Sequence, residues 1–267
     1  MTTIRTKLYN GEVELTFSSF GHKYFITDEK NNKYKESVKS VTTSNSIIAK
    51  PALIGWAARM AAEHYKSCIK PGKSYDEVEL MTIYDEAKSA HRKKKEYAGE
   101  LGTIVHNWVE DYINGKEPAM PINKDLSDSV QKFLDWEKEH DVKFLVAEQQ
   151  IYSRKYIFTG TLDFICVIDG EMYIGDLKTS SGVYMEMLLQ TAAYRFARTE
   201  EYPEEKYKGL VIVRVGKDDG ELEVVKIDDE VKYGRLTGYE WYTKFFTAYI
   251  AAQKLDELSE LIKNFKY

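Results

Sequence analysis

The sequence predicts an α/β protein of the α+β type, and three observations lead to this expectation. Three strand-like segments follow one another over residues 143–178. Residues 209–215 form a fourth segment that is apolar except for Arg214, and residues 221–227 alternate like an edge strand. Amphipathic helical patterns surround these strands, and they cover residues 51–65, 74–91, 102–113, 126–140 and 184–199.

The two ends of the chain complete this picture. Residues 1–45 contain short strands and turns, and the tail from Asp229 onward has helical character. Pro51 suits the first turn of a helix, and Gly102-Thr103 resembles the start of another. We divide the chain into an N-terminal part of strands and helices over residues 1–97 and a core over residues 98–267, together one compact unit.

Composition narrows the class of protein. The chain has 267 residues, of which 43 % are hydrophobic and 30 % charged, which is ordinary for a globular protein. Its net charge of −5 argues against a general basic coat, but a local basic channel could still bind nucleic acid. No segment is long and apolar enough for a membrane span, and no signal peptide is visible. Two cysteines fit a reducing cytoplasm.

The strongest local signal is the segment from Phe158 to Lys178. Asp169-Gly170 between two apolar runs predicts a two-residue hairpin, because both residues tolerate positive φ. Such a turn pairs Ile168 with Glu171, and the same register places Asp163 opposite Asp176. Lys178 follows Asp176 by two residues and therefore points to the same face.

Two opposed carboxylates repel each other, which suggests that a cation lies between them. The nearby lysine could orient a water or stabilise charge on a phosphate. The alternative is an exposed hairpin whose charges simply face water.

Two further features lie upstream of the hairpin. Arg92, Lys93 and Lys94 belong to a basic run that is either a solvated helix face or a surface facing phosphates. His106 and Glu110 are four residues apart and share one helical face. A single histidine on such a helix is either structural or a metal ligand.

In chain order these residues form a set: Gly102-Thr103-x-x-His106, Glu148, Gly160-x-x-Asp163, Asp176-x-Lys178 and Gln190-x-x-x-Tyr194. The set resembles the RecB-like branch of the PD-(D/E)XK nucleases, which includes the mitochondrial genome maintenance exonuclease and CRISPR-associated exonucleases. The resemblance covers residues from about 95 to 215. It implies a restriction-endonuclease-like core, with a central mixed β-sheet flanked by helices.

The resemblance also implies roles. His106, Asp163, Asp176 and the backbone carbonyl of Leu177 would bind Mg²⁺ or Mn²⁺, and Lys178 would be the catalytic lysine. Gln190 and Tyr194 would hold the substrate phosphate or the lysine, unless their helix is an ordinary amphipathic one. Glu148 would stand beside the site on the neighbouring strand, and we group it with the substrate-binding residues.

This sequence departs from the family pattern at three points. Asp176 replaces the commoner glutamate, and Leu162 replaces the proline of the family name, as is usual in the RecB-like branch. With only Cys68 and Cys166, the chain cannot hold the four-cysteine iron–sulfur cluster of some relatives. The resemblance is therefore to the members without a cluster, of the mitochondrial or phage-encoded sort, and it implies the cytoplasm of a bacterium or of a phage-infected host.

The resulting expectation is a metal-dependent DNA exonuclease that prefers single strands or free ends and works in replication, recombination or repair. Helices over residues 51–97 could form an arch over its site. One alternative is a nuclease-fold protein that binds DNA or a recombination partner without cutting. A more remote one is a metal-dependent hydrolase with another substrate.

Overall fold

The computed structural model describes residues 3–263 and 265, and it divides the chain into two compact units. The first unit combines Met1–Ile48 with Val105–Tyr267, and the second is Ala49–Ile104. Our sequence-based division had a boundary at residue 97. The N-terminal strands instead belong to the first unit, because their side chains pack against the core around Tyr152.

The N-terminal strands form a four-stranded antiparallel sheet in the order β1-β2-β3-β4. Its inner side chains, among them Leu8, Val13, Leu15 and Ile26, are almost fully buried together with Tyr152. Short 3₁₀ turns, η1 and η2, close the first and third connections. The bounds are β1 Thr3–Leu8, η1 Tyr9–Gly11, β2 Val13–Ser18, β3 Lys23–Asp28, η2 Glu29–Asn31 and β4 Lys33–Val38.

An arginine fork joins this small sheet to the central one. Arg154 donates through Nε to Asp28 Oδ2 at 2.9 Å and through a terminal nitrogen to Asp28 Oδ1 at 3.1 Å. Its other terminal nitrogen donates to Glu12 Oε2 at 2.7 Å. The Asp28 side chain is fully buried, so this pair fixes charge in the interior. Burial acts to raise the pKa of Asp28, but hydrogen bonds from Asn31 and Arg154 outweigh it, and the pKa is lowered.

The lowered pKa of Asp28 predicts a stability that depends on pH. A carboxyl whose folded pKa lies below its unfolded value of about 3.9 stabilises the fold fully above that value. The contribution is lost as pH falls through the lower folded pKa. We therefore expect Asp28→Asn to lower the thermal midpoint at pH 7, and the gap to wild type to narrow below about pH 4. Calorimetry between about pH 7 and pH 3 measures the difference in thermal midpoint between the two proteins. A difference that does not change with pH would contradict a lowered pKa for Asp28.

The central sheet is five-stranded and mixed, in the order β5-β6-β7-β8-β9. β5, β6 and β7 are antiparallel neighbours, β8 runs parallel to β7, and β9 is antiparallel to β8. The bounds are β5 Lys143–Ser153, β6 Phe158–Ile168, β7 Glu171–Lys178, β8 Gly209–Val215 and β9 Leu222–Asp228. All of β8 is buried, as expected for an apolar strand inside a sheet.

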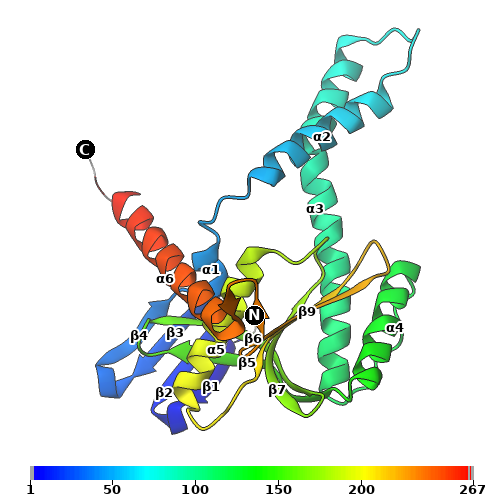
Figure 1. Ribbon diagram of the computed structural model, residues 1–267. Helices are drawn as coiled ribbons and strands as arrows, with labels where there is room; N and C mark the ends of the chain where they lie inside the picture. Colours follow the sequence, from blue (N-terminus) through cyan, green and yellow to red (C-terminus); the bar gives the residue numbers. More distant parts are fainter. Residues whose placement is uncertain (1–2, 264, 266–267) are drawn as a thin grey trace. The chain divides into compact units, whose positions relative to one another are not determined.

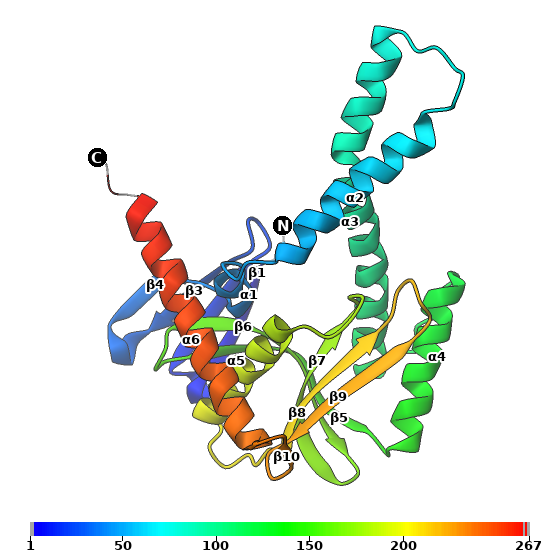
Figure 2. The ribbon, with the colours of Figure 1, turned by 45° about the horizontal axis from the view of Figure 1, so that its top comes forward.

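Helices flank this sheet (Figures 1 and 2). α5, Met185–Glu201, connects β7 to the parallel β8 and packs on β5 to β8 with Leu189, Ala192 and Ala193. α6, Gly238–Lys263, covers α5, and the short α1, Val41–Asn45, packs against both. α4, Lys124–Glu139, lies on the other side of the sheet, where Phe133 meets Phe144.

The predicted hairpin is confirmed. Asp169 and Gly170 have φ of +52° and +86°, which is why this pair suits the turn. Ile168 pairs with Glu171, and the register continues without a shift to Phe164 and Gly175. The next step along that register is Asp163 and Asp176.

Two local expectations were wrong. Gly102-Thr103 does not start a helix, because α3 runs unbroken over Glu77–Ile113; a mid-helix glycine costs only about 1 kcal/mol relative to alanine. The tail is not helical from Asp229, since β10, Lys232–Tyr233, pairs with β11, Leu236–Thr237, before α6 begins.

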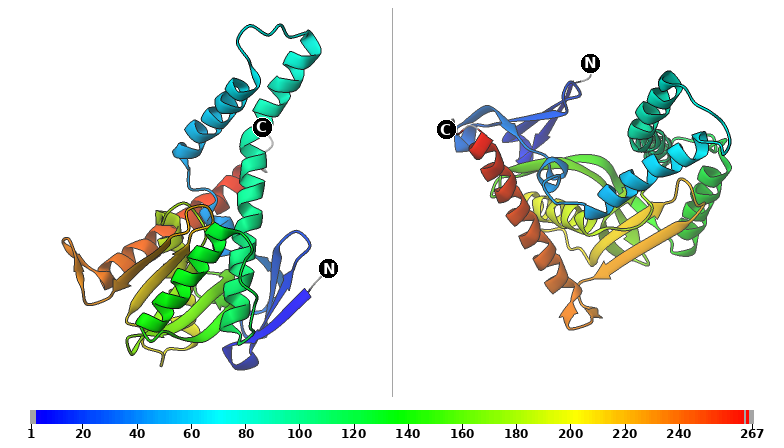
Figure 3. Two further views of the ribbon diagram at one scale, coloured as in Figure 1. Left: turned by 90° about the vertical axis from the view of Figure 1, so that its right-hand side faces the viewer. Right: turned by 90° about the horizontal axis from the view of Figure 1, so that it is seen from above.

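The second unit consists of α2, Pro51–Cys68, and the N-terminal part of α3. The two helices are antiparallel and are joined by a turn around Pro71 and Gly72 (Figure 3). Across the part of the chain that the structure describes, no helix combines the length and apolar character that crossing a membrane requires.

Candidate metal centre

Three carboxylates stand side by side on three neighbouring strands. The pairs Ala147 with Phe164 and Gln149 with Leu162 place Glu148 of β5 opposite Asp163 of β6. The hairpin register in turn places Asp163 next to Asp176 of β7. Such a row of acids at one level of a sheet is unfavourable unless positive charge lies beside it.

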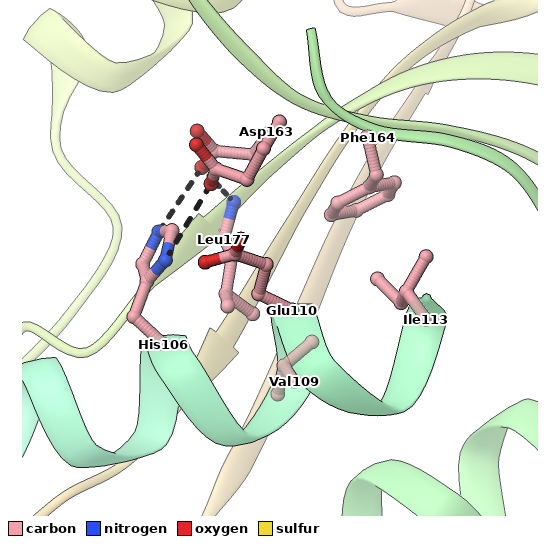
Figure 4. Close-up of a pocket in the computed structure, with 8 residues that line it drawn as sticks. His106, Val109, Glu110, Ile113, Asp163, Phe164 and Leu177 are labelled. Carbon is pink, nitrogen blue, oxygen red and sulfur yellow. Dashed lines mark hydrogen bonds and ion pairs between the residues drawn. The ribbon is translucent and has the colours of Figure 1, made fainter. Parts of the chain in front are cut away.

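His106 of α3 meets this row (Figure 4). Its Nε2 lies 3.6 Å from Asp163 Oδ2, and its Nδ1 lies 3.7 Å from Glu148 Oε1. Ligand atoms of His106, Glu148 and Asp163 all lie within 4.8 Å of one another. The three residues line a small pocket together with Val109, Glu110, Ile113, Phe164 and Leu177.

Glu148 has a strained backbone. Its φ of +49° is left-handed, a conformation that a glutamate adopts at a cost of roughly 1 kcal/mol or more. Burial, with the nearby Asp163 charge adding to it, raises the pKa of Glu148 to about 7. The fold therefore holds this carboxylate in place against both its backbone preference and its electrostatic environment.

Asp163 is ionised more readily than Glu148, because its pKa is lowered and not raised. Its Oδ2 accepts a hydrogen bond from Leu177 N at 2.8 Å, and its side chain is only 12 % exposed. Burial alone would raise the pKa of Asp163, but Lys178, His106 and the Leu177 amide together lower it. The same interaction with Asp163 raises the pKa of His106, although burial opposes that effect.

Asp176 and Lys178 form a buried ion pair. Lys178 Nζ lies 2.5 Å from Asp176 Oδ2 and 3.8 Å from Asp163 Oδ2. Burial raises the pKa of Asp176 to about 7, even though the Lys178 ammonium opposes it. Burial alone would lower the pKa of Lys178, but the charges of Asp176 and Asp163 outweigh burial, and the pKa of Lys178 is raised. The lysine is thus held as a cation directly beside the two aspartates.

The predicted ligand set differs from the observed grouping at two points. Asp176 pairs with Lys178, and the compact group contains Glu148 in its place. The Leu177 carbonyl accepts a hydrogen bond from Lys178 Nζ at 3.2 Å. Glu148, which we had grouped with substrate-binding residues, faces His106 directly. The sequence did contain a signal for this, because pairing β5 with β6 places Glu148 opposite Asp163.

The residues fit a divalent cation. One imidazole and two carboxylates supply the nitrogen and oxygen donors that Mn²⁺ and Mg²⁺ sites use. Asp176 Oδ2 faces the Lys178 ammonium, whereas Oδ1 is fully buried and has no hydrogen-bond partner among the described residues. Buried carboxylate oxygens in that state are normally satisfied by a cation or a water. We infer that a cation bound by His106, Glu148 and Asp163 would also lie close to Asp176.

Gln190 and Tyr194 lie on α5 as predicted. Gln190 Nε2 donates to the Tyr194 hydroxyl at 2.9 Å, and the Tyr194 side chain is almost fully buried. Burial, with the charges of Asp163 and Asp176 adding to it, raises the pKa of Tyr194 well above its usual range. Tyr194 is therefore a neutral hydroxyl near the acidic row.

Gly160 makes room for this tyrosine. A Cβ at Gly160 would lie 2.7 Å from Tyr194 Cε1, which is too close for any real contact. We expect Gly160→Ala to lower the free energy of unfolding by about 1–3 kcal/mol, because the buried ring cannot move aside. Gly99→Ala is the control, since its Cβ would meet nothing within 4 Å in a helix, and it should be neutral or stabilising. Urea denaturation of both variants measures the difference, and equal stabilities would show that the ring does not constrain position 160.

The basic run is exposed on α3 in the second unit. Arg92, Lys93 and Lys94 all face solvent, and Arg92 Nε lies 3.9 Å from Glu96 Oε1. Their contact with a substrate therefore stays a prediction.

Comparison with known proteins adds no family assignment: no protein-family model matches this chain, and no curated protein matches it either.

Proposed function

We propose that this protein is a divalent-metal-dependent DNA nuclease that acts as an exonuclease. The observation that carries the proposal is the convergence of His106, Glu148 and Asp163 on one point, with Lys178 held beside them. A hard cation and a fixed ammonium together suit a reaction in which negative charge grows on a phosphate.

The order of elements supports the same proposal. A helix bearing His106 is followed, after α4, by three antiparallel strands, then by α5 and by a strand parallel to β7. This is the order expected for a restriction-endonuclease-like core of the RecB-like branch. We therefore extend the proposal from the mixed α/β architecture to that fold.

Each residue has a defined task in the proposed reaction. His106, Glu148 and Asp163 would hold Mg²⁺ or Mn²⁺, which when bound supplies a water of lowered pKa and a Lewis acid for the phosphate. Asp163 Oδ2 accepts a hydrogen bond from the Leu177 amide, and the same oxygen lies 3.6 Å from His106 Nε2, so the amide holds the carboxylate beside the imidazole. Lys178 is fixed by Asp176 and the Leu177 carbonyl, so its ammonium can orient the attacking water or stabilise the phosphate oxygens. Gln190 positions the Tyr194 hydroxyl as a neutral donor.

The substrate we propose is DNA, with single strands or free ends preferred. Support comes from the second unit, where Tyr84 and Tyr97 are exposed on α3, which carries the basic run, and Tyr65 is exposed on α2. Exposed rings can stack on unpaired bases while lysines and arginines follow the phosphates. We propose that Arg92, Lys93 and Lys94 bind the backbone in this way, in a replication, recombination or repair setting.

The test is cleavage of end-labelled single- and double-stranded DNA with Mg²⁺ or Mn²⁺. We expect wild type to release nucleotides from ends, and Lys178→Ala to lower the rate by about 10²–10³-fold, as for removal of one preorganised donor. Lys143→Ala, an exposed lysine at the start of β5, should cut like wild type. If wild type and both variants bind DNA tightly but none of them cuts it, the non-cleaving alternative is favoured. If wild type neither binds nor cuts DNA, a hydrolase with another substrate is favoured.

A further inference from the structure

The helices of the second unit have almost no core of their own. Of residues 49–104, all of them described, only Ala87 and Gly102 are buried, and α2 contributes none. A segment of this size normally needs a staple such as a metal ion if it is to hold one arrangement. The side chains that join α2 to α3 therefore contribute an unusually large share of what holds the two helices in one arrangement.

One of those junctions is a cluster of three metal-ligating side chains. His64 and Cys68 are four residues apart on α2 and share one face, and Glu86 approaches them from α3, next to the buried Ala87. His64 Nε2 lies 3.3 Å from Glu86 Oε2 and 3.5 Å from Cys68 Sγ. All three ligand atoms lie within 4.8 Å of one another.

These spacings match the edges of a tetrahedral zinc site. Zinc bonds of about 2.0–2.3 Å at tetrahedral angles separate nitrogen from oxygen by about 3.4 Å and nitrogen from sulfur by about 3.6 Å. The observed distances of 3.3 and 3.5 Å agree with both values.

Hydrogen bonds alone account for the cluster less well. Both neighbours converge on the same imidazole nitrogen, Nε2. A ring nitrogen either donates one proton or accepts one, so it cannot donate to Glu86 and accept from the Cys68 thiol at the same time. A cation between the three atoms satisfies all of them.

The end of α2 is also fixed in place. The Tyr75 hydroxyl donates to the Cys68 carbonyl at 3.0 Å and accepts from Lys70 N at 2.7 Å. This contact closes the turn between the helices and positions the cysteine. The side chains of His64 and Glu86 remain 31 % and 47 % exposed, so an ion can enter from solvent and keep a water as its fourth ligand.

We propose that His64, Cys68 and Glu86 form a Zn²⁺ site that ties α2 to α3. A thiolate, an imidazole and a carboxylate are ligands that zinc accepts together, and the thiolate disfavours Mg²⁺ and Ca²⁺. Cys68 gives its proton to solvent when the ion binds. The site is separate from the candidate centre at His106, and the inference does not rest on the proposed nuclease function.

The test uses the full-length protein, stripped of metal by a chelator and kept reduced with a phosphine. Titration with Co²⁺ should produce the ultraviolet charge-transfer band of cobalt–thiolate bonding, and Zn²⁺ should abolish it. The His106 centre has no cysteine and gives no such band. As a second readout on wild type, alkylation of Cys68 should slow by roughly 100-fold at a Zn²⁺ concentration 100 times Kd. Cys166 is buried and serves as the unreactive internal reference.

The variants decide between outcomes. Cys68→Ser, His64→Gln and Glu86→Gln should each lose the band, whereas Glu63→Gln, beside His64 on α2, should keep it. A wild-type protein that gives no band and no zinc protection of Cys68 overturns the site. So does a band that survives in both His64→Gln and Glu86→Gln, because the cobalt would then be held by Cys68 with other ligands.

Discussion

Asp163→Asn should reduce metal-dependent DNA cleavage by roughly 10³-fold or more, since several kcal/mol of transition-state stabilisation pass through the bound cation. Asp163 stands at the centre of the site, between Glu148 and Asp176 and within 3.6 Å of His106. An amide of the same shape keeps an oxygen for the Leu177 hydrogen bond but removes the negative charge. The rate is measured on end-labelled DNA under single-turnover conditions, and Mn²⁺ affinity is measured separately by calorimetry.

The matched control is Asp169→Asn on the same hairpin. Asp169 lies in the turn at φ of +52°, a conformation that asparagine tolerates well, and its side chain is exposed. This variant should cleave like wild type. If Asp163→Asn also cleaved within a few-fold of wild type while remaining folded, the acidic row would not be the catalytic centre.

Arg154→Ala should lower the free energy of unfolding by about 3–5 kcal/mol, which is the loss expected when one partner of a buried ion pair is removed. The change leaves the fully buried Asp28 carboxylate with its hydrogen bonds from Asn31, of which the side-chain amide bond is 2.8 Å long. It also removes the guanidinium that lies over the Tyr9 ring, 4.3 Å from its centroid. Urea denaturation followed by circular dichroism gives the difference.

Glu12→Gln separates the buried part of this network from its exposed part. The Glu12 side chain is 47 % exposed and shares the same arginine at 2.7 Å. Exposed ion pairs contribute about 0–1 kcal/mol, so the loss should be small. Equal losses from the two variants would show that burial of Asp28 does not decide the strength of the network.

Local sequence signals were enough to predict the central hairpin. The turn at Asp169-Gly170 fixes its own register, because a two-residue loop allows only one pairing of its flanks. The arrangement of Asp163, Asp176 and Lys178 follows from that register and the period of a strand. The strands β5 and β8 and the helices α4 and α5 were also predicted to within a few residues, since β8 is a nearly continuous apolar run and the two helices have a clear helical period.

The remaining parts depended on contacts between distant segments. The role of Glu148 required the pairing of β5 with β6, whose connection over residues 154–157 carries no register signal comparable to Asp-Gly. Gly102-Thr103 indicated the start of a new helix, yet α3 continues through both residues, because the helical contacts on either side outweigh a small local propensity. The junction of His64 and Cys68 with Glu86 depends on how two helices meet, which neither helix determines alone.

Glu148, with its left-handed backbone, lowers the stability of the fold but is needed for the proposed catalytic site. Glycine adopts a φ of +49° without penalty, so a glycine there would relax the chain and remove a carboxyl that burial disfavours. It would also delete one of the two carboxylates that face His106. If variants are selected for heat resistance alone, Glu148 should therefore be replaced. If they are selected for catalytic activity, Glu148 should be retained.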